Sequence, residues 1–444
     1  MFGGPWLDLA ASEVLKRFYL IMAESQEEKA HWRSVLRAFD GYMQYHLSAN
    51  HARRMAFLSL PKEQKQLYAD IGYREKLEAV DEGIRRNAEF IDEMIADPVF
   101  ANLLEEGDQQ SHHSHSYSQS QTQMHSLSPS DQYQSSIRSD PEFSAKPHTH
   151  SHSRSSLSPS RGRPTQADTD LAQDKIRSIL RSFVRDWSEE GAHERRQCYE
   201  PCLDALEKHW KGKQRELGEE IKVLVPGCGL ARLAMEIAAR GFVSQGNEFS
   251  TYMLLASHFV LNQTTRRGSH TIFPYLHSFS NQPTTLNHLL RQVQIPDICP
   301  ADVLGDGQGG AFSLIAGDFE ELYGSEGDEG QRGAWGAVVT CFFIDCARNV
   351  LSYLRIIYDL LADDGIWINL GPLLWHFENS PTTSGKGEGS IELSLDEVKD
   401  LAGKVGFQLH DERTVATGYT GAPDGMLRHE YQAAFWTATK GKRS

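Results

Sequence analysis

Cysteine is scarce in this chain, and its spacing gives no sign of a metal site. The six cysteines among 444 residues include no Cys-x-x-Cys pair and no set at zinc-ligand spacing with histidine. The sequence therefore predicts no metal site and no disulfide framework. Free thiols are typical of a reducing compartment, so we expect the protein in the cytoplasm, with the nucleus as a further location.

The chain also lacks an excess of positive charge and long runs of apolar residues. The formal net charge of −15 argues against non-specific binding to nucleic acid or anionic membranes. No apolar run approaches the roughly 18 to 20 residues needed to cross a bilayer. Residues 1–8 lack the basic and apolar segments of a secretory signal. We therefore expect a soluble protein whose partners include neither nucleic acid nor membrane.

The chain has enough length and apolar content for more than one structural unit. Residues 1–106 carry apolar side chains three and four positions apart, which predicts an N-terminal region of amphipathic helices. Residues 107–168 are rich in Ser, His and Gln and predict a disordered insert, whose seven histidines we assign to a solvated linker. Residues 169–444 alternate strands with helices, which predicts a doubly wound α/β sheet whose last two strands form an antiparallel edge.

A glycine turn after the predicted strand 221–225 is the most informative motif. Gly227 and Gly229 have no Cβ, so a ligand can approach the backbone there. Glu248 ends the next strand, 21 residues after Gly227. That distance is close to the roughly 20 residues expected for a carboxylate that accepts the ribose hydroxyls of an adenosine cofactor. The motif leaves NAD, FAD and S-adenosylmethionine open as that cofactor.

A second candidate position follows the predicted strand 312–315. The carboxylate of Asp318 is placed to accept the exocyclic amine of adenine, and Phe319 to stack on the ring, because open α/β sheets bind ligands at the carboxyl ends of their strands. The alternative is purely structural: a capped turn followed by a core phenylalanine. The residues alone do not separate these two interpretations.

Two further candidates follow the next strands. Asp345 ends the apolar strand 336–343, where it either faces a ligand or caps the predicted helix 347–362. His376 follows the strand 366–370, and a Gly-Pro pair ends that strand. A single histidine is more often structural than catalytic, but the neighbouring strand carries Asp345, and this favours a shared site.

Several segments together resemble the carnosine N-methyltransferase family. They are Phe183–Ser188, Val223–Ala234, Gln245–Ser250, Phe342–Asp345, Trp367–His376 and Ile391–Ser394. The resemblance implies a class I methyltransferase fold, which is Rossmann-like, with an added N-terminal helical region. It also implies S-adenosylmethionine as the cofactor and methyl transfer to the imidazole of carnosine, giving anserine. The partner would then be a small histidine-containing peptide.

The resemblance also implies a role for each matching residue. The implied cofactor-binding residues are Arg185 at the methionine carboxylate, Gly227 beside it, Glu248 at the ribose, Asp318 and Phe319 at adenine, and Cys341 in the same pocket. The implied substrate-binding residues are Asp345, His376 and Tyr431, and Asp345 is also the implied catalytic group. No residue is implied to bind a metal.

The chain departs from the family pattern at two positions. Ser182 stands where the family has glutamine, one turn before Arg185, so a cofactor contact is expected to be lost or mediated by water. Ala231 stands where relatives carry a third glycine. We expect alanine to be tolerated there on the assumption that the position is already helical.

Two other classes of function stay open at this point. An NAD-dependent oxidoreductase would prefer the full Gly-x-Gly-x-x-Gly, but Arg232 occupies its last position, and such an enzyme would not explain Asp345 with His376. A catalytically silent binding module would keep the fold and use the insert as an interaction tail. The N-terminal helices are expected to pack on their own sheet or on a second subunit, which leaves a homodimer open.

Overall fold

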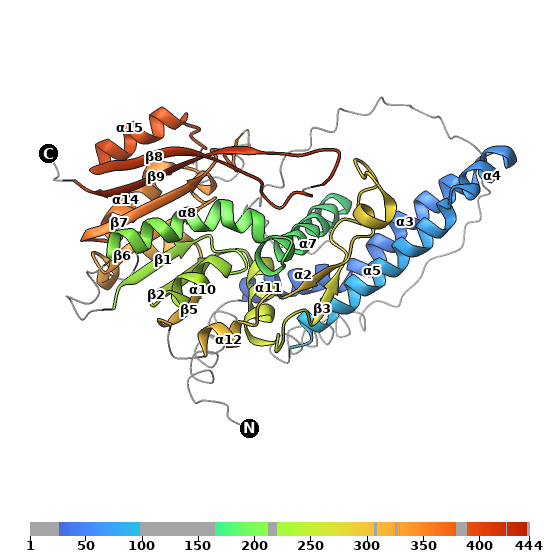
Figure 1. The fold of residues 1–444 in the computed structure, drawn as a ribbon, viewed down its shortest axis with the longest axis horizontal. Helices are drawn as coiled ribbons and strands as arrows, with labels where there is room; N and C mark the ends of the chain where they lie inside the picture. The colour runs from blue at the N-terminus through green and yellow to red at the C-terminus, as the bar shows by residue number, and fades with distance from the viewer. Residues whose placement is uncertain are drawn as a thin grey trace, which may run out of the picture.

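A computed structural model describes residues 26–97, 165–211, 220–305, 309–324, 327, 329–378, 389–422 and 424–441. Its centre is a seven-stranded sheet with the order β5-β2-β1-β6-β7-β9-β8 (Figure 1). The strands are β1 (Lys222–Pro226), β2 (Val243–Glu248), β5 (Phe312–Ala316), β6 (Trp335–Cys341), β7 (Leu361–Gly371), β8 (Phe407–Thr417) and β9 (Tyr431–Lys440).

The sheet is parallel except for one strand. β5, β2, β1, β6 and β7 pair in parallel, whereas β9 runs antiparallel to both of its neighbours, β7 and β8. The predicted doubly wound α/β fold with an antiparallel edge is therefore confirmed. Because the parallel strands share one direction, their carboxyl ends meet along a single edge of the sheet, where ligands bind in such folds.

Helices cover both faces of the sheet. They are α8 (Ala192–Trp210), α10 (Arg232–Ala239), α11 (Thr251–Asn262), α13 (Phe319–Tyr323), α14 (Val350–Leu360) and α15 (Leu395–Val405). Successive strand residues point to opposite faces. Val223 and Val225 of β1 therefore join the core shared with α8 and α10, whereas Leu224 joins the core under α13, α14 and α15. Both sides of the sheet are apolar, as a buried parallel sheet requires.

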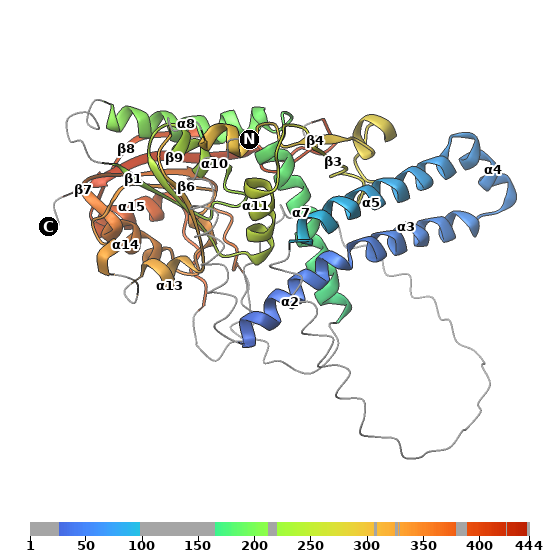
Figure 2. The same ribbon diagram turned by 90° about the horizontal axis from the view of Figure 1, so that it is seen from below.

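The N-terminal helices pack on the chain's own sheet domain. They are α2 (Gln26–Asp40), α3 (Tyr42–Leu58), α4 (Lys62–Asp70) and α5 (Tyr73–Ile95). Side chains of α2 and α5 belong to the same core cluster as those of α7 (Gln166–Trp187) and α11. Asn87 of α5 exchanges two hydrogen bonds with the backbone of Phe273, at 2.9 and 2.8 Å. The far ends of α3 and α5, with α4, project as an arm (Figure 2).

The boundary of the predicted insert shifts by a few residues. Residues 107–164 lie outside the described residues. The helix α7 begins at Gln166, where Thr165 and Asp168 form a capping box, so the last residues assigned to the insert start this helix. The connection expected to be irregular also contains a small antiparallel sheet of β3 (His270–Ile272) and β4 (Val293–Ile295), and the helix α12 (Pro300–Leu304).

The sequence predicts neither a disulfide framework nor a membrane-spanning segment. All six cysteines lie among the described residues, and none of them forms a disulfide. In the described ranges, none of the helices combines the length and the apolar character that a bilayer crossing requires.

Candidate active site

A cavity of about 590 Å³ opens at the carboxyl ends of the parallel strands. Its volume lies in the range of small-molecule sites. All nine residues predicted to form the site line it: Arg185, Gly227, Glu248, Asp318, Phe319, Cys341, Asp345, His376 and Tyr431. Ser182, at the position of the family's glutamine, lines it as well. The structure thus brings together the residues that the sequence spreads over nearly 250 positions, from Arg185 to Tyr431.

The glycine turn between β1 and α10 requires both of its glycines. Gly227 has φ of +62°, and a Cβ at this position would lie 2.5 Å from Cδ2 of Phe343. Gly229 has φ of +57°, and a Cβ there would meet no atom within 4 Å. The bare backbone of Gly229 therefore faces open space at the cavity wall, as expected of a turn that cradles a ligand.

The expectation for Ala231 is wrong. This residue is not helical: it has φ of +64° in the left-handed region and forms the N-cap of α10. A side chain with a Cβ is disfavoured in that conformation by roughly 1–2 kcal/mol. The turn therefore needs glycine-like dihedrals at its third position too, and alanine adopts them under strain.

Glu248 is buried at the end of β2 and is fixed by three backbone amides. One carboxylate oxygen accepts the N–H of Gly229 at 2.8 Å, and the other accepts those of Phe249 and Ser250 at 3.0 and 2.8 Å. Burial raises the pKa of Glu248 to about 7, against the opposing effect of these amide bonds. The side chain thus connects the glycine turn to the end of β2 and still lines the cavity.

Asp318 and Phe319 serve the structure as well as the cavity wall. Oδ1 of Asp318 accepts the N–H groups of Glu320 and Glu321 at 2.8 and 3.2 Å and so caps α13. Phe319 is only 3% exposed, and its ring lies edge-on to Phe343 at 5.3 Å between centroids. The structural interpretation of this pair is therefore confirmed, and contact with adenine stays a prediction.

Asp345 does not cap the helix that follows it. The N-cap of α14 is Asn349, whose Oδ1 accepts the N–H of Leu351 at 3.1 Å. Asp345 lies in the short 3₁₀ turn η3 (Ile344–Cys346), and its Oδ2 accepts the N–H of Leu374 at 2.9 Å. The side chain is buried, and burial raises the pKa of Asp345 to about 7. A buried carboxylate without a capping role is a candidate for ligand binding.

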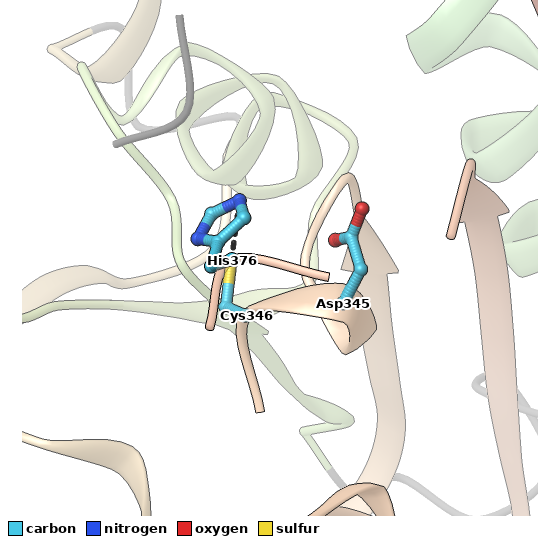
Figure 3. Close-up of side chains that lie close together, drawn as sticks. All are labelled: Asp345, Cys346 and His376. Carbon is cyan, nitrogen blue, oxygen red and sulfur yellow. Dashed lines mark hydrogen bonds between the residues drawn. The ribbon is translucent and has the colours of Figure 1, made fainter. Parts of the chain in front are cut away.

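His376 lies beside Asp345, as the order of the strands predicts (Figure 3). The backbone N–H of His376 donates to the carbonyl of Asp345 at 3.1 Å, which fixes the loop after β7 against the turn after β6. Burial lowers the pKa of His376 to about 4, so the imidazole is neutral at physiological pH. Nε2 of His376 lies 3.8 Å from Sγ of Cys346, a neighbour that the sequence analysis did not include.

Aromatic side chains also line the cavity. Tyr431, at the start of β9, packs edge-on against Phe342 with 5.9 Å between ring centroids. Burial and then the nearby charge of Asp345 raise the pKa of Tyr431. Tyr419 packs on the same Phe342 ring at 4.7 Å, and the guanidinium of Arg185 lies 4.6 Å over the ring of Tyr419. Together these groups form a mostly aromatic wall beside a cation.

Phe342 and Tyr419 also line the cavity, although neither was among the site residues predicted from the sequence. Phe342 has φ of +55°, an unfavourable conformation for a bulky residue, and such strain concentrates at functional sites. No pattern in the sequence reveals that conformation. Tyr419 did carry a signal, because it lies in the glycine-flanked connection between the last two strands, which ends at the same edge of the sheet.

The strand order with its single reversed strand, and the cavity at the carboxyl edge, define a class I methyltransferase fold. The family model described as carnosine N-methyltransferase matches residues 163–442. The chain therefore belongs to the carnosine N-methyltransferase family, as the resemblance of its motifs predicts.

Curated relatives agree with this assignment. Carnosine N-methyltransferases of Drosophila melanogaster and Mus musculus are each 40% identical to this chain, over 60% of its length. The matches span 55% and 63% of those two proteins, less than two thirds of each. The Schizosaccharomyces pombe relative is also 40% identical, over 61% of this chain and 71% of its own. A solved magnesium protoporphyrin IX methyltransferase from Synechocystis aligns at 13% identity, over 63% of this chain and 90% of its own, with a TM-score of 0.30.

Proposed function

We propose that this protein transfers a methyl group from S-adenosylmethionine to an imidazole nitrogen of carnosine, giving anserine, or of a related histidine-containing peptide. The observation that carries the proposal is a buried carboxylate, Asp345, beside the neutral imidazole of His376, in the cavity that the glycine turn also lines. Membership of the carnosine N-methyltransferase family supports the choice of acceptor.

The residues at the glycine turn fit S-adenosylmethionine. The exposed backbone of Gly229 and the carboxylate of Glu248 suit the methionine portion and the ribose, and Arg185 suits the carboxylate end. Phe319 and Asp318 line the same cavity and are the residues proposed to contact adenine. When bound, this cofactor supplies an electrophilic methyl group on a sulfonium. The chain's own residues then have to present one neutral nitrogen of the acceptor to it.

Asp345 is suited to select which ring nitrogen reacts. A free imidazole has a pKa of about 6.5, so most of the acceptor is already neutral at pH 7 and a strong base is unnecessary. When the carboxylate of Asp345 accepts the N–H of one ring nitrogen, the other nitrogen keeps its lone pair. Positive charge grows on the ring as it is alkylated, and the anionic side chain stabilises that charge. The carboxylate of Asp345 then takes the remaining ring N–H proton and passes it to solvent, which leaves a neutral methylimidazole. The N–H of Leu374 holds the carboxylate in place.

His376 and Tyr431 complete the acceptor end of the cavity. His376 is partly buried and neutral, so it contributes hydrogen bonding without a repelling charge. Tyr431, at the start of β9, also lines the cavity and, like His376, is a candidate to hold the ring or the peptide of the acceptor. Holding two reactants in line accounts for a large share of such accelerations, up to roughly 7–11 kcal/mol in favourable cases.

A binding and turnover assay tests the proposal directly. S-adenosylhomocysteine is expected to bind the purified protein and NADH is not, which separates a methyltransferase from an oxidoreductase. Carnosine with methyl-labelled cofactor is then expected to give a methylated imidazole, located by mass spectrometry of the product. Binding of S-adenosylhomocysteine without methylation of any histidine-containing peptide would favour a silent module instead.

The burial of Glu248 predicts a pH-dependent affinity for the cofactor. With a pKa of about 7 in the free protein, Glu248 is ionised above that pH and protonated below it. Ribose hydroxyls donate to the ionised form, so the Kd for S-adenosylhomocysteine should rise by about tenfold between about pH 8 and about pH 6. Calorimetric titration at both pH values measures this change. Equal affinities would show that the charge of Glu248 does not contribute.

We also propose that the arm of α3, α4 and α5 supports a homodimer. Leu67 and Ile71 near its tip are 68% and 77% exposed, although both are large and apolar. Exposed apolar patches mark interaction surfaces. Sedimentation should therefore show a dimer that becomes a monomer in the double variant Leu67→Glu, Ile71→Glu. Leu395→Glu, on α15 far from the arm, should leave the dimer intact (Figure 1). A monomeric unmodified protein would contradict the proposal.

A further inference from the structure

Three different metal-binding side chains meet at the acceptor end of the cavity. One ligand atom from each of Asp345, Cys346 and His376 lies within 4.8 Å of the other two. Asp345 and Cys346 come from the turn η3 after β6, and His376 comes from the loop after β7. Figure 3 shows the sulfur of Cys346 against the imidazole ring, with the carboxylate of Asp345 on the same side of the turn.

The separation of sulfur and nitrogen fits a tetrahedral zinc ion. Zinc bonds of about 2.3 Å to sulfur and about 2.0–2.1 Å to nitrogen place these two atoms roughly 3.5 Å apart at a tetrahedral angle. In this protein Sγ of Cys346 and Nε2 of His376 are 3.8 Å apart. A small movement is therefore enough for both to bind one ion. A carboxylate oxygen of Asp345 lies within 4.8 Å of both of these atoms and is available as the third ligand.

Backbone hydrogen bonds hold the segments that carry the candidate ligands. The N–H of Leu374 donates to Oδ2 of Asp345, and the N–H of His376 donates to the carbonyl of Asp345, so two backbone bonds orient the ligand-bearing segments. Such supporting bonds tune metal sites. A thiolate and an imidazole select zinc-like ions over magnesium or calcium. With three protein ligands, a tetrahedral ion keeps its fourth position for water or another small ligand.

We propose that Asp345, Cys346 and His376 form a binding site for zinc or a similar divalent cation, and that the bound ion inhibits the enzyme. Cys346 loses its proton to solvent when it binds the ion, and no group is oxidised or reduced. The ion occupies the side chains that are proposed to hold the acceptor, so it excludes the peptide. The inhibitory part of this inference rests on the proposed function; the binding part does not.

Cobalt(II), used as a spectroscopic substitute for zinc, tests the binding part without any cofactor or acceptor. The full chain with cobalt is expected to show the near-ultraviolet absorption of a thiolate-bound ion, and zinc is expected to displace it. Cys346→Ser should abolish that absorption. Cys299→Ser should retain it, because Cys299 lies away from the cavity, where its thiol faces the carbonyl of Thr264.

Two results of the cobalt experiment would overturn the site. One is the absence of thiolate absorption from the unmodified protein, and the other is its persistence in Cys346→Ser. Binding through the histidines of residues 107–164 alone gives no thiolate absorption, since that segment has no cysteine. If Cys346→Ser does not fold, as judged by its thermal unfolding, Cys346→Ala is used in its place and is held to the same outcome.

The inhibitory part is tested by methyl transfer at increasing zinc concentrations. Zinc is expected to compete with the peptide and not with the cofactor. The zinc concentration for half inhibition should rise by more than about 10-fold in Cys346→Ser, because the loss of even an outer-shell supporting group costs roughly 10- to 100-fold in metal affinity. Each variant is compared to its own zinc-free rate. Equal inhibition of both proteins overturns the regulatory role. If no methyl transfer is detected at all, the proposed function fails, whereas the cobalt absorption still decides whether the site exists.

Discussion

Asp345→Asn is expected to lower kcat by about 1,000-fold and to leave the affinity for S-adenosylhomocysteine nearly unchanged. Removing one preorganised electrostatic contact to a developing charge costs about 100- to 1,000-fold. Asparagine keeps the shape and the acceptor for the N–H of Leu374, so the turn should stay in place. It removes the negative charge that stabilises the alkylated ring, and its amide no longer enforces one tautomer of the acceptor.

The measurement pairs single-turnover methyl transfer to carnosine with calorimetric titration of S-adenosylhomocysteine. Asp363→Asn is the matched control, because it makes the same chemical change at an exposed residue near the start of β7. It should retain both activities. A parallel loss of turnover and cofactor affinity in Asp345→Asn would show that Asp345 supports the structure of the cavity and not the chemistry.

Much of the fold and of the cavity was predictable from local patterns. An apolar run that ends in Gly-Cys-Gly, followed at the expected distance by Glu248, predicts two parallel strands and a ligand-binding edge. Asp345 and His376 follow neighbouring strands, and parallel strands bring their carboxyl ends together. The juxtaposition of these two side chains therefore follows from topology. The roles of the individual residues toward cofactor and acceptor remain predictions.

The features that escaped prediction depend on backbone geometry or on distant packing. The left-handed dihedrals of Ala231 and Phe342 leave no pattern in the sequence, because neither residue type favours them. The cap of α14 falls on Asn349 and not Asp345, because η3 inserts a turn before the helix begins. The contact of Cys346 with His376 depends on how two loops pack, which periodicity does not encode.

Glu248→Gln is expected to raise the Kd for S-adenosylhomocysteine by about 100-fold, with a smaller effect on the turnover of the saturated enzyme. Hydrogen bonds to a charged acceptor contribute about 1.5–3 kcal/mol each, and two ribose hydroxyls lose that charge. The side-chain NH₂ of glutamine would also face either the N–H of Gly229 or those of Phe249 and Ser250. These groups are all hydrogen-bond donors, so one side of the contact would lose its acceptor. Glu248→Ala should weaken binding further, because it leaves all three amides without their acceptor.

Calorimetry and thermal unfolding of the ligand-free variants separate binding from folding. Glu78→Gln, at an exposed position on α5, is the matched control and should bind like the unmodified protein. The two central variants are expected to differ in kind: Asp345→Asn loses turnover at normal cofactor affinity, whereas Glu248→Gln loses affinity and regains turnover at high cofactor concentration. This contrast follows from the positions of the two carboxylates, one at the end of β2 and bonded to the glycine turn, and one beside His376. If Glu248→Gln binds S-adenosylhomocysteine normally, Glu248 does not hold the ribose, and the orientation proposed for the cofactor is wrong.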